Sequence, residues 1–386
     1  MEMSQRHRAL PIFRIGCTGV ILVLILVAGG YFFLYPILTP DRIRGDLIDC
    51  VIVPQNAETG RLWILTDGSF NYISSTKTPG RYSIGRKCLS CKAWIYEYDP
   101  VREKVIRKIK VKYDDIIMNA GILYSKGTVY HVADAYRKGE ARVLLYDAAT
   151  GTMVGDTKSF ISRHPELSGG ITKARLDKNN RTMEFDTRDG KTNLVYSSED
   201  ERVYPSYSSF LDEQRKDTRE TDMFFLCSED SHDARKLLYR ATGPRRQLLD
   251  RRSALERNCS GNMKHITRHI KGFTTQRMQD LVFLQGMIYH QDDEGAIIIH
   301  LNQTGRKADR IITCVDHDGK IKWTVPQSEL FDQLKIDEDR DVMTRVDLSK
   351  DKIAVLRSGN MVVLEVYQLG LIGFDHKTGK KIFTVN

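Results

Sequence analysis

Short apolar stretches joined by polar turns recur along most of the chain. Residues 144–154 show the pattern: an apolar run leads to Asp147, a polar turn closes at Gly151, and a second stretch follows. An aspartate side chain accepts hydrogen bonds from backbone N–H groups further along a turn, and glycine tolerates the positive φ that a tight hairpin requires. The pattern therefore predicts an antiparallel hairpin wherever it occurs.

Six segments carry this strand–turn–strand pattern. They are residues 94–106, 144–154, 183–194, 237–248, 312–323 and 371–382. Other apolar or alternating stretches are expected to form further strands, at residues 282–284, 296–300, 352–356 and 361–367. Together they give about four strands per repeated unit, which is typical of a propeller blade.

The expected fold is all-β: a β-propeller of about six to eight four-stranded blades, with seven favoured by chain length, after one N-terminal transmembrane helix. An apolar share of 41% is enough for a large core. We also expect the last strand, which runs to Asn386, to complete a blade begun by the apolar run at residues 51–53. Such closure leaves no open sheet edge.

The turns resemble the repeat of quinoprotein-like propellers, A-x-D-x-x-T-G-x-x-x-W. Residues 147–151 and 375–380 fit its turn, and the segment 316–323 supplies its tryptophan, Trp323. The resemblance covers most of the chain as a weak repeat, and it implies the fold rather than one function. Propellers of this type include dehydrogenases that use pyrroloquinoline quinone and non-enzymatic scaffolds that assist outer-membrane protein assembly.

The sequence favours a binding or scaffold module over an enzyme. A quinoprotein dehydrogenase would be expected to have adjacent cysteines, and this chain has none. The recurring aspartates are explained by turn chemistry, so we expect no cofactor and no bound metal. His265 and His269 lack the glutamate of a zinc protease, because Ile266 follows the first histidine. The acidic stretches 291–294 and 337–341 are expected to be exposed loops. An enzyme with its site in the propeller channel is the alternative.

Cys88 and Cys91 are the only closely spaced cysteines. A C-x-x-C pair can be a small structural disulfide, a redox pair or half of a zinc site. No thioredoxin-like βαβ pattern surrounds this pair. We therefore favour a structural disulfide or unpaired thiols, with the redox and metal alternatives left open.

Residues 15–35 contain no charged side chain and are mostly apolar. As a helix, this segment would span roughly the 30 Å of a bilayer core. It predicts a retained single-pass anchor, with signal-peptide cleavage near residues 28–30 as the alternative. The expected division is a cytoplasmic tail at 1–14, the transmembrane helix at 15–35, a juxtamembrane linker at 36–49 and the propeller at 50–386.

The arginines near this segment indicate its orientation. Arg6, Arg8 and Arg14 precede it, whereas the two arginines that follow it, Arg42 and Arg44, lie among aspartates. Positive charge favours the cytoplasmic side of a membrane. We therefore expect an inner-membrane protein with its large domain in the periplasm, and a cytoplasmic domain is the alternative.

The formal net charge is +9, and basic residues are concentrated in one stretch. This basic cluster consists of Arg245, Arg246, Arg251, Arg252, Arg257, Lys264, Arg268 and Lys271. It is expected to be either a surface for an anionic partner, such as lipid head groups or an acidic envelope protein, or a solvated loop between blades. Nucleic acid is not an expected partner, because aromatic residues are not interleaved with the basic ones.

Overall fold

The structure is a computed structural model whose compact unit spans Ile43–Asn386. Residues 42–386 are described, except for 57, 79–80, 114–116, 136–139, 179, 215, 217–218, 229–233, 245–247, 249–273, 305–307, 327, 330–352, 367–369 and 386. The predicted anchor at 15–35, the whole basic cluster, the histidine pair and the acidic stretch 337–341 lie outside the described residues. Within the described part of the chain, no helix is long and apolar enough to cross a membrane.

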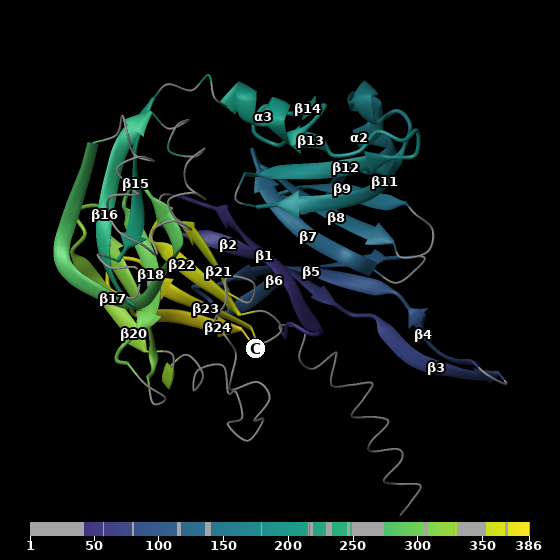
Figure 1. Cartoon of the computed structure of the whole chain (residues 1–386). Coiled ribbons are helices and arrows are strands. Elements are labelled where there is room, and N and C mark those ends of the chain that lie inside the picture. The colour runs from purple at the N-terminus through teal and green to yellow at the C-terminus, as the bar shows by residue number, and fades with distance from the viewer. Residues whose placement is uncertain are drawn as a thin grey trace, which may run out of the picture. The chain divides into compact units, whose positions relative to one another are not determined.

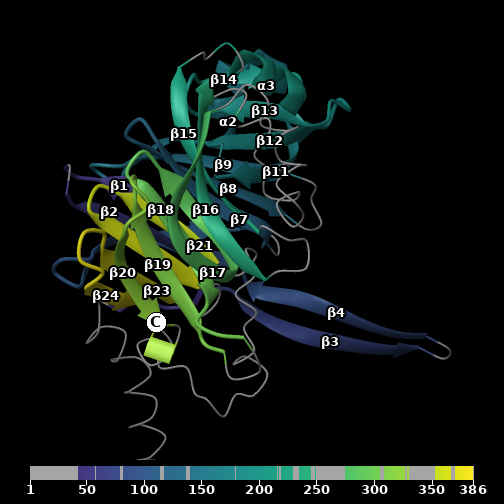
Figure 2. The ribbon, with the colours of Figure 1, turned by 60° about the vertical axis from the view of Figure 1, so that its left-hand side comes forward.

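The first sheet is antiparallel, with strand order β1-β2-β5-β6. Its strands are β1 (Asp46–Pro54), β2 (Gly60–Asp67), β5 (Lys92–Asp99) and β6 (Lys104–Lys112). Between β2 and β5 the chain forms β3 (Phe70–Thr78) and β4 (Arg81–Ser90), which pair with each other as a separate hairpin. This hairpin projects away from the sheets (Figure 2).

Two further four-stranded antiparallel sheets follow, each with its own helix after the last strand. The second sheet contains β7 (Ile117–Ser125), β8 (Thr128–Ala135), β9 (Ala141–Asp147) and β10 (Met153–Gly155), followed by α2 (Thr157–Arg163) and the 3₁₀ turn Pro165–Leu167. The third contains β11 (Ile171–Asp177), β12 (Thr182–Thr187), β13 (Leu194–Ser197) and β14 (Arg202–Tyr204), followed by α3 (Tyr207–Gln214). Asp156 and Ser159 form a capping box that starts α2.

The remaining described strands form one six-stranded and one four-stranded sheet. The six-stranded sheet contains β15 (Glu220–Cys227), β16 (Arg235–Pro244), β17 (Thr274–Asp292), β18 (Gly295–Leu301), β19 (Arg310–Asp316) and β20 (Ile321–Pro326). The last sheet contains β21 (Ile353–Ser358), β22 (Met361–Val366), β23 (Gly370–Asp375) and β24 (Lys381–Val385). The long strand β17 pairs with β16 along its first half and with β18 along its second, and Leu284 is paired on both sides.

Several of the described sheets contact one another. β1 packs against both β7 and β21, β11 packs against β7 and β8, and β17 packs against β21 (Figure 1). Four-stranded antiparallel sheets that repeat along the chain and pack against one another are typical of a β-propeller. The predicted all-β propeller is confirmed at this level.

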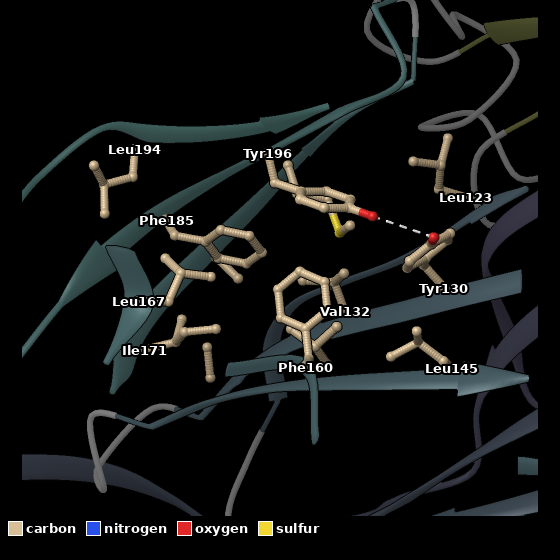
Figure 3. Close-up of a cluster of buried hydrophobic side chains, with 14 residues drawn as sticks. Leu123, Tyr130, Val132, Leu145, Phe160, Leu167, Ile171, Phe185, Leu194 and Tyr196 are labelled. Atoms are coloured by element: carbon tan, nitrogen blue, oxygen red, sulfur yellow. Dashed lines mark hydrogen bonds between the residues drawn. The ribbon is translucent and has the colours of Figure 1, made fainter. Parts of the chain in front are cut away.

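The core lies between the sheets, so most strands are buried on both faces. Between the first and last sheets, Ile64 and Tyr96 pack with Val363 and Phe383. Between the second and third sheets, Phe160 from α2 packs edge-on against Phe185 and Tyr196 (Figure 3). Replacing a buried phenylalanine of this kind with alanine typically costs about 3–5 kcal/mol. Packing between blades is therefore a main source of stability.

The predicted turn chemistry is present in the hairpins. The Asp147 carboxylate accepts hydrogen bonds from the backbone N–H and the hydroxyl of Thr150, both at 2.7 Å. Asp375 accepts the same two bonds from Thr378. Gly379 has a φ of +68° and lies directly under the Trp323 ring of the preceding sheet. The turn glycine thus serves both the hairpin and the contact between sheets.

The repeat tryptophan joins two sheets. The indole N–H of Trp323 in β20 donates a 2.8 Å hydrogen bond to the His376 carbonyl, and its ring stacks on Phe374. Both partners belong to the last sheet or its turn. Trp323, the tryptophan of the quinoprotein-like repeat, therefore connects two blades.

Two expectations are wrong. Residues 237–248 do not form a hairpin, because β16 continues through Arg240 to Pro244 and pairs with neighbours on both sides. This segment has Arg240 where the other copies have the aspartate that starts the turn. The C-terminal strand does not complete the first blade either, since β24 pairs with β23 while β1 pairs with β2. The first and last sheets meet by side-chain packing instead.

Candidate functional site

One face of the β5–β6 pair gathers lysines around a tryptophan. Lys92 is paired with Lys112, Trp94 with Lys110, and Tyr96 with Lys108. Residues directly opposite each other in an antiparallel pair project from the same face of the sheet. We call the set formed by Arg44, Lys92, Trp94, Lys108, Lys110 and Lys112, together with the fully buried Tyr96, the Trp94 surface.

The lysine ammonium groups lie over the indole ring. The Nζ atom of Lys108 is 3.9 Å from the ring centroid of Trp94, and those of Lys110 and Lys92 are 5.6 Å and 5.8 Å away. A cation over an aromatic face gains about 0.5–1 kcal/mol at an exposed site. Trp94 is half-buried, while Lys108 and Lys110 are exposed. The ring therefore holds several ammonium groups together at the surface.

The amino end of the compact unit lies at this surface. The Tyr96 hydroxyl accepts a hydrogen bond from the Arg44 backbone N–H at 3.2 Å and is 3.3 Å from the Arg44 carbonyl oxygen, to which it can donate. The Thr66 hydroxyl donates to the same carbonyl at 2.7 Å. Ile43 packs in the same apolar cluster as Trp94. The chain therefore enters the propeller beside the lysines.

Like charges crowd the Trp94 surface. Burial, and then the positive charges of Arg44 and Lys92, lower the pKa of Lys108 below its ordinary value. None of the four lysines forms an ion pair with a described residue. The sequence has no aspartate or glutamate from residue 68 to residue 96. The positive charge of these four lysines is thus concentrated here, with no ion pair to a carboxylate in the described part of the chain.

A second group of charged residues lies where three sheets meet, and we call it the central ion cluster: Asp49, Lys178 and Glu365. Asp49 is on β1, Lys178 follows β11, and Glu365 is on β22. The Lys178 ammonium pairs with Asp49 and lies 3.6 Å from Glu365. Asp49 also accepts the Ile122 backbone N–H of β7 at 2.8 Å. Its carboxylate therefore connects the first sheet to the second and third.

In the central ion cluster, one ammonium group is shared by two carboxylates. Burial raises the pKa of Glu365 and lowers that of Lys178, and the attraction between the two opposes both shifts. The neighbouring Cys50 thiol is fully buried, and burial followed by the Glu365 charge raises its pKa. A protonated, inaccessible thiol is a poor nucleophile. This cluster joins blades and contains no activated nucleophile.

A third charged group includes two carboxylates of the acidic stretch 291–294. Arg357 of β21 forms ion pairs with Asp292 and, at 2.6 Å, with Glu294, which also lies 3.4 Å from His376. Asp292 and Glu294 remain on the exposed side of the sheet, as expected for a loop. Burial raises the pKa of Asp292, but hydrogen bonds from His290 and the Glu294 backbone, with the Arg357 charge, lower it overall. Within the described ranges, no three His, Cys, Asp or Glu side chains are placed to hold a metal ion.

The predicted site residues are only partly described. Cys91 is disulfide-bonded, whereas the side chain of Cys88 is outside the described part of the chain. Cys50, Cys227 and Cys314 are buried thiols. The basic cluster at 245–271 is not described, so its role stays a prediction.

The sequence contains a signal for the Trp94 surface that the hairpin pattern alone does not use. Lysines alternate with apolar residues at positions 108, 110 and 112 of one strand. An alternation of period two puts them on one face. Their position opposite Trp94 depends on the register of β5 and β6, which composition does not provide.

Comparisons with known proteins do not assign a function, so the function is inferred from the site. No protein family matches the sequence, and no curated protein matches it either. Solved structures align over most of the chain. A chain in the crystal structure of a mitotic checkpoint complex aligns with 8% identity and a TM-score of 0.25, covering 87% of this chain and 92% of that one. Sqt1 of Saccharomyces cerevisiae aligns with 9% identity and a TM-score of 0.26, covering 89% of this chain and 86% of that one. The β-propeller domain of the Trilobed protease from Pyrococcus furiosus aligns with 10% identity and a TM-score of 0.26, covering 86% of this chain and 84% of that one. At these TM-scores the fold assignment rests on the strand pairing described above.

Proposed function

We propose that this chain is a binding or scaffold module rather than an enzyme, and that the Trp94 surface is its contact site for an anionic partner. The observation that carries the proposal is the concentration of lysines around one half-buried tryptophan, with no ion pair to a described carboxylate. By contrast, the charged groups of the central ion cluster form ion pairs within the fold. An enzyme with its site in the propeller channel is the competing function.

We further propose that the module is held at a membrane by residues 15–35 as a single-pass anchor, with the propeller in the periplasm. The uncharged stretch is long enough to span a bilayer core. Arg44, only a few residues further on, is hydrogen-bonded at the Trp94 surface. This arrangement supports a propeller whose binding surface is near its tether.

Three finer assignments belong to the same proposal. The six-stranded sheet is treated as two blades that share β17, which gives six blades from the described strands, while seven is the number favoured by chain length. Cys88 is assigned as the partner of disulfide-bonded Cys91, in a structural role. The basic cluster at 245–271 is assigned as a second contact for anionic partners.

The test compares two charge-matched variants of the full chain in a neutral detergent. Lys108→Gln with Lys110→Gln changes the Trp94 surface, and Lys158→Gln with Lys381→Gln changes exposed lysines elsewhere, on α2 and β24. The probes are polyglutamate and mixed micelles that contain an anionic phospholipid. Each lysine near an anionic surface contributes about 1 kcal/mol, so the first variant should bind at least one probe roughly 20-fold more weakly.

The control variant should bind within about twofold of the unmodified chain, because its two substitutions lie away from the Trp94 surface, and it has the same net charge as the Lys108→Gln, Lys110→Gln variant. Equal binding of both probes by the two variants would show that the Trp94 surface is not the contact site. Bound probe is measured by fluorescence anisotropy, with salt titration as a second readout.

A further inference from the structure

We propose that the anionic partner of the Trp94 surface is the phospholipid membrane itself, and that the β3–β4 hairpin lies against the same bilayer. This inference rests on the proposed function, since it names the partner of the same site. It is carried by three observations: a projecting hairpin, its attachment to the Trp94 surface, and the place where the chain enters the propeller.

The hairpin is a long pair of strands that no other described strand joins. β3 and β4 pair with each other from Phe70 opposite Ser90 to Thr78 opposite Arg81. Figures 1 and 2 both show it extending away from the sheets. An isolated two-stranded hairpin is only marginally stable in water and gains from packing against another surface.

The composition of the hairpin indicates what that surface is. Residues 70–90 contain no aspartate or glutamate. They contain four basic and three aromatic residues, Lys77, Arg81, Arg86, Lys87, Phe70, Tyr72 and Tyr82. Basic residues favour anionic head groups, and aromatic residues concentrate at the membrane–water interface. This combination matches an anionic bilayer better than it matches water.

The base of the hairpin is fixed to the Trp94 surface. The Gly68 backbone N–H donates to the Lys92 carbonyl at 3.0 Å. The Ser69 hydroxyl donates to that carbonyl at 3.1 Å and accepts the Lys92 backbone N–H at 3.1 Å. Lys92 therefore belongs both to the lysine group, through its side chain, and to the attachment of the hairpin, through its backbone.

The entry point of the chain brings the Trp94 surface close to a bilayer. Arg44 is hydrogen-bonded to Tyr96 on the Trp94 surface. Between the end of the uncharged segment at residue 35 and Arg44, a fully extended chain reaches at most about 30 Å. A tether this short gives the surface a high effective concentration of lipid head groups. An acidic protein would have to compete with a partner that is always present.

The experiment uses the full chain in lipid nanodiscs made of phosphatidylcholine alone or of phosphatidylcholine with 30% phosphatidylglycerol. Hydrogen exchange of residues 70–90 and of β6 is the first readout. We expect exchange to be at least tenfold slower in the anionic nanodiscs. The Lys108→Gln, Lys110→Gln variant should lose most of this protection, and the Lys158→Gln, Lys381→Gln control should keep it.

Tryptophan fluorescence gives a second readout. The chain has three tryptophans, and Trp63 and Trp323 are only 0% and 7% exposed, so Trp94 is the one that external quenchers reach. Brominated phosphatidylglycerol should quench the emission in anionic nanodiscs by a third or more, and Trp94→Phe should abolish that quenching.

Equal exchange in the two kinds of nanodisc, together with no quenching, would overturn the membrane assignment. If the lysine variant had nevertheless lost polyglutamate binding in detergent, the proposed function would stand with an acidic protein as partner. If polyglutamate and lipid binding were both unaffected by the lysine variant, the proposed function would fall as well.

Discussion

The central ion cluster and the Trp94 surface use charged residues in opposite ways. In the first, Lys178 lies between Asp49 and Glu365, and all three are largely removed from water. In the second, lysines of one sign share a single indole ring at the protein surface. Removing one partner from a buried ion pair leaves an uncompensated charge, which is costly. Exposed charges of one sign contribute little to folding, so they are available for binding.

This difference separates charges that are paired within the fold from charges that we propose for binding. Ion pairs connect Asp49, Lys178 and Glu365 across three sheets, and their removal should affect the free energy of unfolding. Replacement of Lys108 and Lys110 should affect binding only. Two predictions test this division and a third concerns a buried histidine, and they follow in order of the expected effect on stability.

The largest effect is expected for Asp49→Ala. This change leaves the buried backbone N–H groups of Ile122 and Cys50 without the carboxylate that accepts them, and it removes one of the two carboxylate partners of Lys178. Because each unsatisfied buried donor costs about 1–3 kcal/mol, the free energy of unfolding should fall by about 3–5 kcal/mol. Urea unfolding followed by circular dichroism measures the loss. Asp46→Ala is the matched control on the same strand, where the side chain is exposed. A loss no greater than that of the control would remove the structural role of the cluster.

A pH effect of about 3 kcal/mol is expected from His131, a buried polar group between the first and second sheets. Burial lowers its pKa to about 4, and the hydrogen bond to the Gly121 carbonyl partly opposes this shift. In the unfolded chain the pKa is near 6.5. The unfolded state therefore binds a proton first, so the stability supplied by neutral His131 is complete above about pH 6.5 and is lost as pH falls towards 4.

Urea unfolding of the full chain at pH 7.5 and pH 4.5 measures this effect. In His131→Gln, the difference between the free energies of unfolding at pH 7.5 and pH 4.5 should be about 2–3 kcal/mol smaller than in the unmodified chain. The comparison removes the contributions of other groups, which are common to both proteins. An unchanged pH dependence in the variant would mean that His131 is protonated in the folded state.

The smallest effect on stability is expected at the Trp94 surface. Replacing both Lys108 and Lys110 with glutamine should change the free energy of unfolding by no more than about 0.5 kcal/mol, since exposed substitutions are usually within this range. The loss of cation–π contacts is offset by relief of repulsion between like charges. A destabilisation of 2 kcal/mol or more, measured by urea unfolding, would place these lysines among the structural residues.

The sequence predicts local structure well where turn chemistry is explicit. Asp147, Asp316 and Asp375 each start a hairpin as expected, because the aspartate bonds within its own turn. The segment at Arg240 has glycine and apolar residues but no aspartate, and it forms a continuous strand. The structure of this segment is set by its pairing with a strand on each side, and the sequence pattern of the segment does not show which strands those are.

The candidate site was harder to predict because its parts come from different strands. Trp94 and Lys108 are separated by a turn whose length and bulge fix their register. Asp49, Lys178 and Glu365 are far apart in the chain, so no local spacing links them. The prediction that the last strand completes the first blade failed for a related reason. An apolar strand at each end of the chain is equally consistent with pairing and with packing.

Each sheet of this propeller uses strands that follow one another along the chain, and this has a consequence for biosynthesis. The first sheet is complete once residue 112 has left the ribosome, since none of its strands is supplied from the carboxyl end. A ring closed by a shared strand would have to hold an unpaired edge until synthesis ends. Here it is side-chain contacts with the last sheet, such as those of Ile64 and Tyr96 with Val363 and Phe383, that wait for the last strands. The propeller can therefore assemble blade by blade from its amino end, with closure as the final step.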